Sequence, residues 1–318
     1  MKTGKLVVIC LIVAVAGFVL CGIGYLCGGR VYKISLNKNG IIVNSNQSVN
    51  GEGLSEYIDE DKELEPFTNL DIDIAFADFK VVESDHYGIE YHLDREALIY
   101  EEISQDTLKI TQKSAPGADN EKSFLSIGIP FFGGMDNGQE YVIIHMPKGT
   151  ELGTVSIKNA SGDVALVDLQ AENVVLENTF GSMKTEKINA KTVDINLEAG
   201  DFAFESIVSE ELNIENRFGN IEGQEATAEN IVIGIESGDC AIKDMSSTVS
   251  EFNSKFGSLS LGLHETVATY SVEAKTVFGS VTVNDDEKGT GYQNDVTETE
   301  HSIKMDSESG DIELYDAK

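Results

Sequence analysis

Three aspartates occupy matching places in repeated turns in which a small residue, Gly and Asp follow one another. Metal binding is the chemistry that their regular spacing could serve. Asp163, Asp201 and Asp239 follow one another at equal intervals along the chain. If the repeats stack, these carboxylates fall into one column, and oxygen ligands of this kind are those that calcium prefers. The calcium β-roll, however, uses a nonapeptide Gly-Gly-x-Gly-x-Asp pattern, which is absent here. The column is therefore predicted to be structural, with a row of bound calcium ions as the alternative.

The other residue types that could catalyse a reaction or bind a metal form no motif. There is no HExxH motif or His/Cys cluster, no Gly-x-Ser-x-Gly elbow and no Walker loop. The acidic residues single out no catalytic pair, and tryptophan is absent as a platform for sugar rings. We expect a protein without enzymatic activity or cofactor, and a carbohydrate-active β-helix enzyme is the least favoured alternative. The histidines are scattered along the chain, at His86, His92, His145, His264 and His301.

Charge limits the partners. The 318 residues carry a formal charge of −32 at pH 7, and 41% of them are hydrophobic, enough for a real core. Residues 1–38 contain five basic and no acidic side chains, so residues 39–318 hold 18 basic against 55 acidic ones. Nucleic acid is excluded as a partner because phosphate binding needs a basic face. The acidic part should also repel anionic lipid surfaces.

The N-terminal region contains one long apolar segment, from Leu6 to Cys27. Its 22 residues reach roughly 33 Å as a helix, enough to span a bilayer. A signal-peptide h-region is shorter, and leucine precedes both candidate lipoprotein cysteines, Cys21 and Cys27. Residues 1–30 are thus predicted to be an uncleaved transmembrane anchor. Flanking basic residues are nearly balanced, and the long acidic domain favours an extracellular C-terminus.

Cysteine usage excludes a disulfide scaffold, a zinc ribbon and a Cys-pair redox site. Cys10, Cys21 and Cys27 lie in the apolar segment, and only Cys240 lies in the remaining chain. Cys240 falls on an apolar position of the repeats described below. We therefore expect it to be a buried core residue without reactivity.

Two regions separate the anchor from the repeats. Residues 31–66 are rich in Asn, Ser, Gly and acidic residues and are predicted to be a linker. Residues 67–148 change to short segments with a two-residue apolar period, as in 70–76, which predicts a strand-rich entry to the repeat domain. A Gly- and Pro-containing stretch at 114–138 interrupts these strands and is predicted to be a long loop.

A 19-residue repeat over 149–318 is the main structural signal. The second position after each repeat glycine is always apolar, and the fourth is mostly apolar. No stretch has helical apolar spacing long enough for crossover helices, so each unit should hold two or three short strands that stack on the next. The sequence predicts an all-β fold, a parallel β-solenoid of 19-residue coils. The turn glycines are Gly162, Gly181, Gly200, Gly219, Gly238 and Gly257, with related turns at Gly279 and Gly310.

The residues around the glycines alternate from one unit to the next. Phe180, Phe218 and Phe256 alternate with small residues before the glycine, which predicts large-over-small packing. After the glycine, Asp alternates with Ser or Asn, which separates like charges and supplies hydrogen-bond donors. The glycines are expected at corners that need positive φ. Residues 283–308 break the spacing and are predicted to be an excursion protecting one end of the solenoid.

These features together resemble the bacterial "putative adhesin" family of Gram-positive envelope proteins. The resemblance covers roughly residues 67–316. It rests on the apolar N-terminal segment, the turn Met146–Gly149 and the Ser-Gly-Asp turns at 161–163, 237–239 and 309–311. It implies a β-solenoid displayed at the cell envelope, sometimes encoded near envelope-stress regulators, and it supplies no catalytic residues.

Two further hypotheses of function remain beside the enzyme. The first is a single-pass membrane protein that binds an unknown protein or glycan partner outside the cell, as an adhesin or a modulator of envelope stress. The second is a cytoplasmic-facing scaffold whose solenoid ends stack into polymers, as unpaired terminal strands could do. They differ in membrane orientation and in whether the ends are capped.

Overall fold

The computed structural model describes most of the chain outside the N-terminal segment. The predicted membrane segment Leu6–Cys27 lies outside the described residues, as does most of the predicted loop 114–138. Within the described part, no helix combines the length and apolarity needed to cross a bilayer. The described residues are 33–37, 40–44, 57–94, 99–112, 125–127, 140–294, 296 and 299–317.

The chain divides into two compact units. The smaller one, formed by 1–54 and 116–135, contains a three-stranded antiparallel sheet in the order β2-β1-β9. Its strands are β1 (Lys33–Asn37), β2 (Gly40–Asn44) and β9 (Leu125–Ile127). Two of these strands therefore lie in the segment that was predicted to be a linker.

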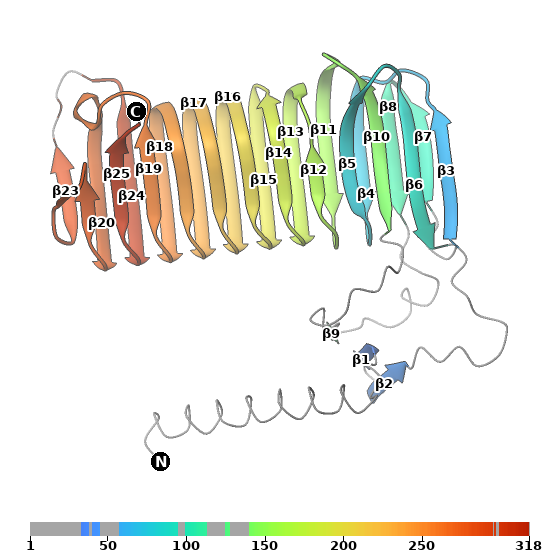
Figure 1. Ribbon diagram of the computed structural model, residues 1–318, viewed down its shortest axis with the longest axis horizontal. Helices are drawn as coiled ribbons and strands as arrows, with labels where there is room; N and C mark the ends of the chain where they lie inside the picture. Colours follow the sequence, from blue (N-terminus) through green and yellow to red (C-terminus); the bar gives the residue numbers. More distant parts are fainter. Residues whose placement is uncertain are drawn as a thin grey trace. The chain divides into compact units, whose positions relative to one another are not determined.

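The larger unit is all-β and forms a solenoid (Figure 1). Its central strands pair in parallel, and each residue lies beside the residue 19 positions further on, as in Phe202↔Ile221 and Ile221↔Cys240. The predicted parallel solenoid of 19-residue coils is confirmed for this region. The central strands are β11 (Glu151–Asn159), β12 (Val164–Leu166), β13 (Leu169–Phe180), β14 (Met183–Asn189), β15 (Thr192–Ala199), β16 (Phe202–Phe218), β17 (Ile221–Ser237), β18 (Cys240–Phe256) and β19 (Leu259–Leu263).

One continuous core runs through the coils because alternate side chains point inward. In β16, Phe202 and Phe204 are buried on the first part of the coil, and Leu212 and Ile214 on the last part. The sizes of side chains in neighbouring coils are complementary. A Cβ on Gly223 would lie only 2.2 Å from the ring of Phe204. The missing side chain in one coil thus makes room for the large ring in the next.

The N-terminal end of the solenoid is built from seven strands. β4 and β5 continue the parallel ladders of β11 and β12, and the next layer is β8 beside β4 and β10 beside β5. Beyond them, β6, β3 and β7 are antiparallel. The strands are β3 (Tyr57–Glu63), β4 (Asn69–Ile74), β5 (Asp78–Ser84), β6 (Gly88–Asp94), β7 (Ile99–Ser104), β8 (Thr107–Gln112) and β10 (Tyr141–Pro147).

An acidic run at the end of the predicted linker, residues 59–65, lies largely in an edge strand. This run supplies most of β3, which pairs along its length with β6. A strand dense in charge suits this position, because charged edges resist pairing with another chain. The predicted linker 31–66 is therefore structured where its charge density is highest.

The C-terminal coils are stacked out of sequence order. β20 (Ser271–Phe278) and β21 (Val281–Val283) form the last coil in space, although a later segment returns to lie beneath it. That segment, β24 (Ser302–Ser309) and β25 (Ile312–Asp316), pairs on one side with β18 and β19 and on the other with β20 and β21. The chain's last coil is thus inserted between two earlier ones (Figure 1).

Short antiparallel strands border the last coil. β22 (Asp286–Glu287) pairs with β21, and β23 (Gly291–Asn294) pairs with β20. The prediction that 283–308 is one protective excursion is therefore only partly right, because β24 within it is a regular strand of the solenoid. One 3₁₀ turn, η1 (Val267–Thr269), precedes β20.

The turn glycines should tolerate no side chain. In Gly219, φ is +137° and a Cβ would lie 2.1 Å from the carbonyl oxygen of Gly200. We expect Gly219→Ala to lower the free energy of unfolding by about 3 kcal/mol or more, since such backbone strain alone costs about 1–3 kcal/mol. Chemical and thermal denaturation of the variant measure the effect.

Gly149→Ala is the matched control for this substitution. Its φ is +74°, but nothing lies within 4 Å of the added Cβ. It should cost only about 1 kcal/mol, from the left-handed backbone. Equal losses in the two variants would show that the close approach of the coils does not determine stability.

Candidate binding surface

One long edge of the solenoid is formed by the turn glycines and the residues on either side of them. In this turn edge, the N–H of each turn glycine except Gly279, which lies in the end coil, donates to the carbonyl before the turn of the next coil, as Gly219 N does to Ser237 O at 3.0 Å. A Cβ on any of the eight predicted turn glycines would lie 1.8–2.2 Å from a carbonyl oxygen of the neighbouring coil. Seven of them have φ between +130° and +153°; Gly279 is the exception. Ala77 occupies the equivalent place next to Gly162.

The predicted aspartate column lies along this edge and binds backbone amides. Asp163 Oδ1 accepts from the N–H of Ser182 at 2.8 Å, and Asp239 Oδ1 accepts from the N–H of Ser258 at 2.7 Å. Asp201 Oδ1 bonds the N–H of Asn220 in the same way, at 2.8 Å. The donor in each case is the main chain of the next coil, whereas the sequence analysis expected the Ser and Asn side chains. Among the residues that the structure describes, no group of three or more possible ligands is placed to hold a metal ion.

A second column, buried beneath the turns, was missed by the sequence analysis. Three residues before the glycine, Asn178 Nδ2 donates to Gly181 O at 2.9 Å and to Gly162 O at 3.2 Å. Asn216 is 1% exposed and donates to Gly200 O at 3.1 Å. Ser254 and Thr276 use hydroxyl groups to bond the same kind of carbonyl. Polar residues recurring at this inward position were the available signal.

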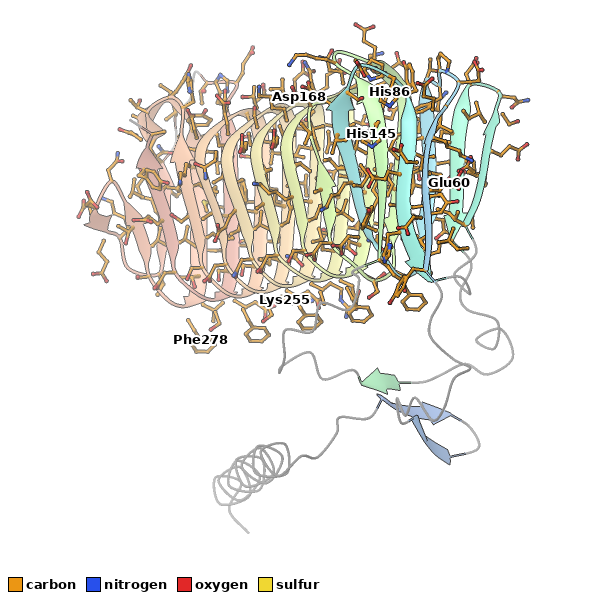
Figure 2. All side chains as sticks on the ribbon, turned by 45° about the vertical axis from the view of Figure 1, so that its right-hand side comes forward. Glu60, His86, His145, Asp168, Lys255 and Phe278 are labelled. Atoms are coloured by element: carbon orange, nitrogen blue, oxygen red, sulfur yellow. The ribbon has the colours of Figure 1, made fainter. Side chains whose placement is uncertain are left out.

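The phenylalanines of the turn edge are exposed. Figure 2 shows rings projecting from this edge, with Phe278 labelled at one end. The predicted large-over-small alternation is present, since Phe180 lies beside Ala199 and Phe218 lies between Ala199 and Ser237. The rings do not pack into the structure, however. We call the five residues the phenylalanine row: Phe76 (57% exposed), Phe180 (59%), Phe218 (51%), Phe256 (61%) and Phe278 (75%).

A column of alternating charge runs beside the row, one position earlier in each coil. The residues at this position in successive coils are Glu198, Arg217, Glu236 and Lys255. Arg217 donates hydrogen bonds to both glutamates. Lys255 Nζ lies 2.5 Å from Glu236 Oε1. Hydrogen bonds from Lys255 and Arg217 lower the pKa of Glu236. Because these groups are exposed, we expect each pair to contribute little to stability.

Two open grooves of comparable size lie on the described surface. One of about 660 Å³ crosses β14, β16 and β17, beside Lys184, Glu205 and Glu222. The other, of about 600 Å³, runs beside the phenylalanine row at the C-terminal coils. Its lining is rich in side chains that are able to form hydrogen bonds, among them Glu236, Asn253, Ser254, Lys255, Thr290 and Glu308.

Three of the five scattered histidines lie at the N-terminal end, and two of them are in contact. The rings of His86 and His145 stack at 5.9 Å (Figure 2), and His92 stacks on Tyr57 at 4.5 Å. His92 Nδ1 lies 2.6 Å from Asp59 Oδ1, and a hydrogen bond to Asp85 raises the pKa of His86. Each histidine is thus occupied with a neighbour. The sequence did not reveal this proximity because it depends on pairing between β3, β6 and β10.

Comparison with known families agrees with this architecture. Residues 67–315 match the family described as Toastrack DUF4097. The chain belongs to this family. The resemblance expected from the sequence is confirmed, because this match covers nearly the same residues as the resemblance, which was expected over 67–316. The search of the curated proteins found no relative.

Three solved structures illustrate the likeness of this Toastrack domain. A putative adhesin from Bacteroides fragilis shares 13% identity over 83% of this chain and 98% of its own, with a TM-score of 0.44. A putative adhesin from Parabacteroides distasonis shares 13% identity over 81% and 97%, with a TM-score of 0.39. A putative lipid binding protein from the same species shares 15% identity over 84% and 98%, with a TM-score of 0.39.

Substitutions in the aspartate column distinguish a structural role from calcium binding. Asn220 Oδ1 accepts the N–H of Asp239 at 2.9 Å, so an amide oxygen serves at this position as well as a carboxylate. We therefore expect Asp201→Asn to leave the thermal midpoint nearly unchanged. Asp201→Ala, which removes the acceptor, should cost about 1 kcal/mol.

The same melts in calcium and in chelator provide the second readout. The unaltered Toastrack protein should melt at one temperature in both solutions. A midpoint that rises with calcium, and no longer does so in Asp201→Asn, would establish the metal alternative.

The thiol of Cys240 should be unreactive in the folded protein. It is 1% exposed, lies between Ile221 and Leu259 in the core, and burial raises its pKa to about 12. A raised thiol pKa leaves little thiolate at pH 8, and the thiolate is the reactive form. Peptide mass spectrometry should find Cys240 unmodified by iodoacetamide in the native protein and fully modified after denaturation. Comparable labelling in both states would contradict this.

Proposed function

We propose that this Toastrack protein is a single-pass membrane protein that displays its acidic solenoid outside the cell and acts by binding. In this proposal the apolar segment Leu6–Cys27 anchors the chain, and the turn edge meets a protein or glycan partner at the cell envelope. By binding this partner, the Toastrack protein serves as an adhesin or as a modulator of envelope stress. No catalytic step is part of the function.

The observation that carries the proposal is the phenylalanine row. Exposed aromatic side chains cost hydration free energy in a free monomer, and rows or patches of them mark interaction sites. All five rings lie more than half in solvent, along one edge of the solenoid. The groove beside the row is open rather than enclosed, which suits a long partner better than a small substrate.

The polymerising scaffold has less support. Its assembly needs unpaired parallel strands at the solenoid ends, and both ends of the described domain carry antiparallel strands instead. β3 at one end is dense in charge, and β23 at the other is only four residues long. Charge and shortness are the features by which edge strands avoid pairing with another chain.

Protease shaving of intact cells tests the membrane orientation. A tag placed after Lys318 should be lost from intact cells, while a cytoplasmic marker survives, because the proposed solenoid faces outward. Lysed cells, in which both are cleaved, are the control. Protection of the tag until lysis would place the solenoid inside and favour the scaffold.

A further inference from the structure

The phenylalanine row has a regular period in space. Coils of the solenoid lie ~4.8 Å apart, so rings on every second coil are spaced by ~9.6 Å, and the row is ~38 Å long. Between the rings, small residues occupy the same position of the turn. From one end of the solenoid to the other, the order is Phe76, Ser161, Phe180, Ala199, Phe218, Ser237, Phe256, Ser309 and Phe278.

The coil formed by β24 and β25, which is stacked out of sequence order, shows that the alternation is a property of the folded edge. In sequence, the turns of Phe256 and Phe278 follow one another and break the alternation. In space, Ser309 pairs with both of them and restores it. The period is thus kept along the folded edge even where it is lost along the chain.

Internal stability does not account for the alternation. Rings on successive coils would stack at ~4.8 Å and bury their faces against each other, as aromatic ladders do. The small residues prevent this stacking and leave the rings separately exposed. Evenly spaced single rings favour a partner with a matching repeat.

Hydrogen-bonding groups line both sides of the row. On one side, Asp201 and Asp239 accept the amides of the next coil through Oδ1, and each carboxylate has a second oxygen that can accept a hydrogen bond. On the other side lies the groove of about 600 Å³, with Glu236, Lys255 and Ser254 in its wall. Apolar rings flanked by carboxylates and hydroxyls are the chemistry that binds sugars, whose C–H faces stack on rings and whose hydroxyls donate to carboxylates.

We propose that the phenylalanine row binds a linear β-1,4-linked glycan, with one disaccharide for each interval between rings. The two-coil period is close to the length of a disaccharide in such an extended glycan. Each ring then meets an equivalent sugar face, and the flanking columns bind the hydroxyl groups. This inference rests on the proposed function, in which the solenoid faces outward and meets its partner at the envelope.

Two other classes of partner fit the row less well. A lipid surface has no repeat that a period of ~9.6 Å could match, and the acidic domain repels anionic lipids. A polyproline helix has a similar period of ~9.3 Å. Its recognition, however, uses aromatic side chains that can also donate a hydrogen bond to peptide carbonyls, and phenylalanine has no donor.

Binding of oligosaccharides of increasing length tests the inference. The full chain, in nanodiscs of neutral lipid, is titrated with chitin oligosaccharides from two to about eight sugars, followed by calorimetry. Affinity should rise with length and level off near eight sugars, when all four intervals are filled. An α-1,4-linked glucose oligomer of the same length, which coils, should not show this dependence.

Phe218→Ser is the decisive variant because it divides the row at its centre. Serine occupies the same turn position at Ser161, Ser237 and Ser309, so the fold accepts it. The variant should weaken binding of the longest chitin oligosaccharide by tenfold or more. It should affect the disaccharide little. Val208→Ser, which replaces a 42% exposed apolar side chain away from the turn edge, is the control and should bind normally.

Three outcomes would overturn the inference. The first is an affinity for chitin oligosaccharides that does not depend on their length. The second is equal affinity of Phe218→Ser and Val208→Ser for the longest chitin oligosaccharide. The third is binding of a nonaproline peptide, weakened by Phe218→Ser, in a protein that does not bind chitin oligosaccharides. Because the titration uses purified protein, it is independent of membrane orientation. If chitin oligosaccharides bind but the tag is protected in intact cells, the proposed function alone is refuted. If the tag is lost from intact cells but no chitin oligosaccharide binds, the glycan inference alone is refuted.

Discussion

The contact between each turn glycine and the carbonyl of the neighbouring coil determines the rest of the structure. It brings the backbones of successive coils so close that a Cβ has no room. The approach sets the register of both parallel ladders, since a shift of one residue would place a side chain against a carbonyl and turn the core positions outward. Once the glycines are aligned, the aspartates meet the amides of the next coil, and the buried asparagines and hydroxyls meet the glycine carbonyls. Every column of the turn edge follows from this alignment.

The alignment also explains why the solenoid tolerates a coil inserted out of order. Gly310 approaches Gly257, and Gly279 approaches Gly310, at the same distances as the glycines of consecutive coils. The ladders therefore do not distinguish chain neighbours from distant segments. The C-terminal strands β24 and β25 gain partners on both sides, whereas the coil that precedes them in sequence becomes the end. The terminus of the chain is thus among the most extensively paired parts of the domain.

The sequence predicted the features that repeat and missed those that depend on three-dimensional order. The 19-residue spacing of glycines and apolar positions was sufficient for the solenoid, because both follow from stacking. The place of β24 could not be predicted, since the spacing before Gly310 is irregular and only the pairing with β18 reveals its position. The phenylalanines were expected to pack, because apolar residues usually do, and their exposure became visible only when the turn was seen to project them outward. The proximity of His86 and His145 depends on strands from distant parts of the chain. Within the linker, composition suggested a lack of structure, and pairing with β6 overrode it at β3.

The interlocked C-terminal coils limit how such a domain can change its length in evolution. New units cannot stack directly on β24 and β25, because both sides of these strands are already paired, and growth is simplest among the central coils. A duplication of a single coil there would place two identical turns side by side and shift every later ring out of step. A duplication of two coils together would lengthen the edge and keep its spacing. The doublet, rather than the single repeat, is therefore the heritable unit of this surface.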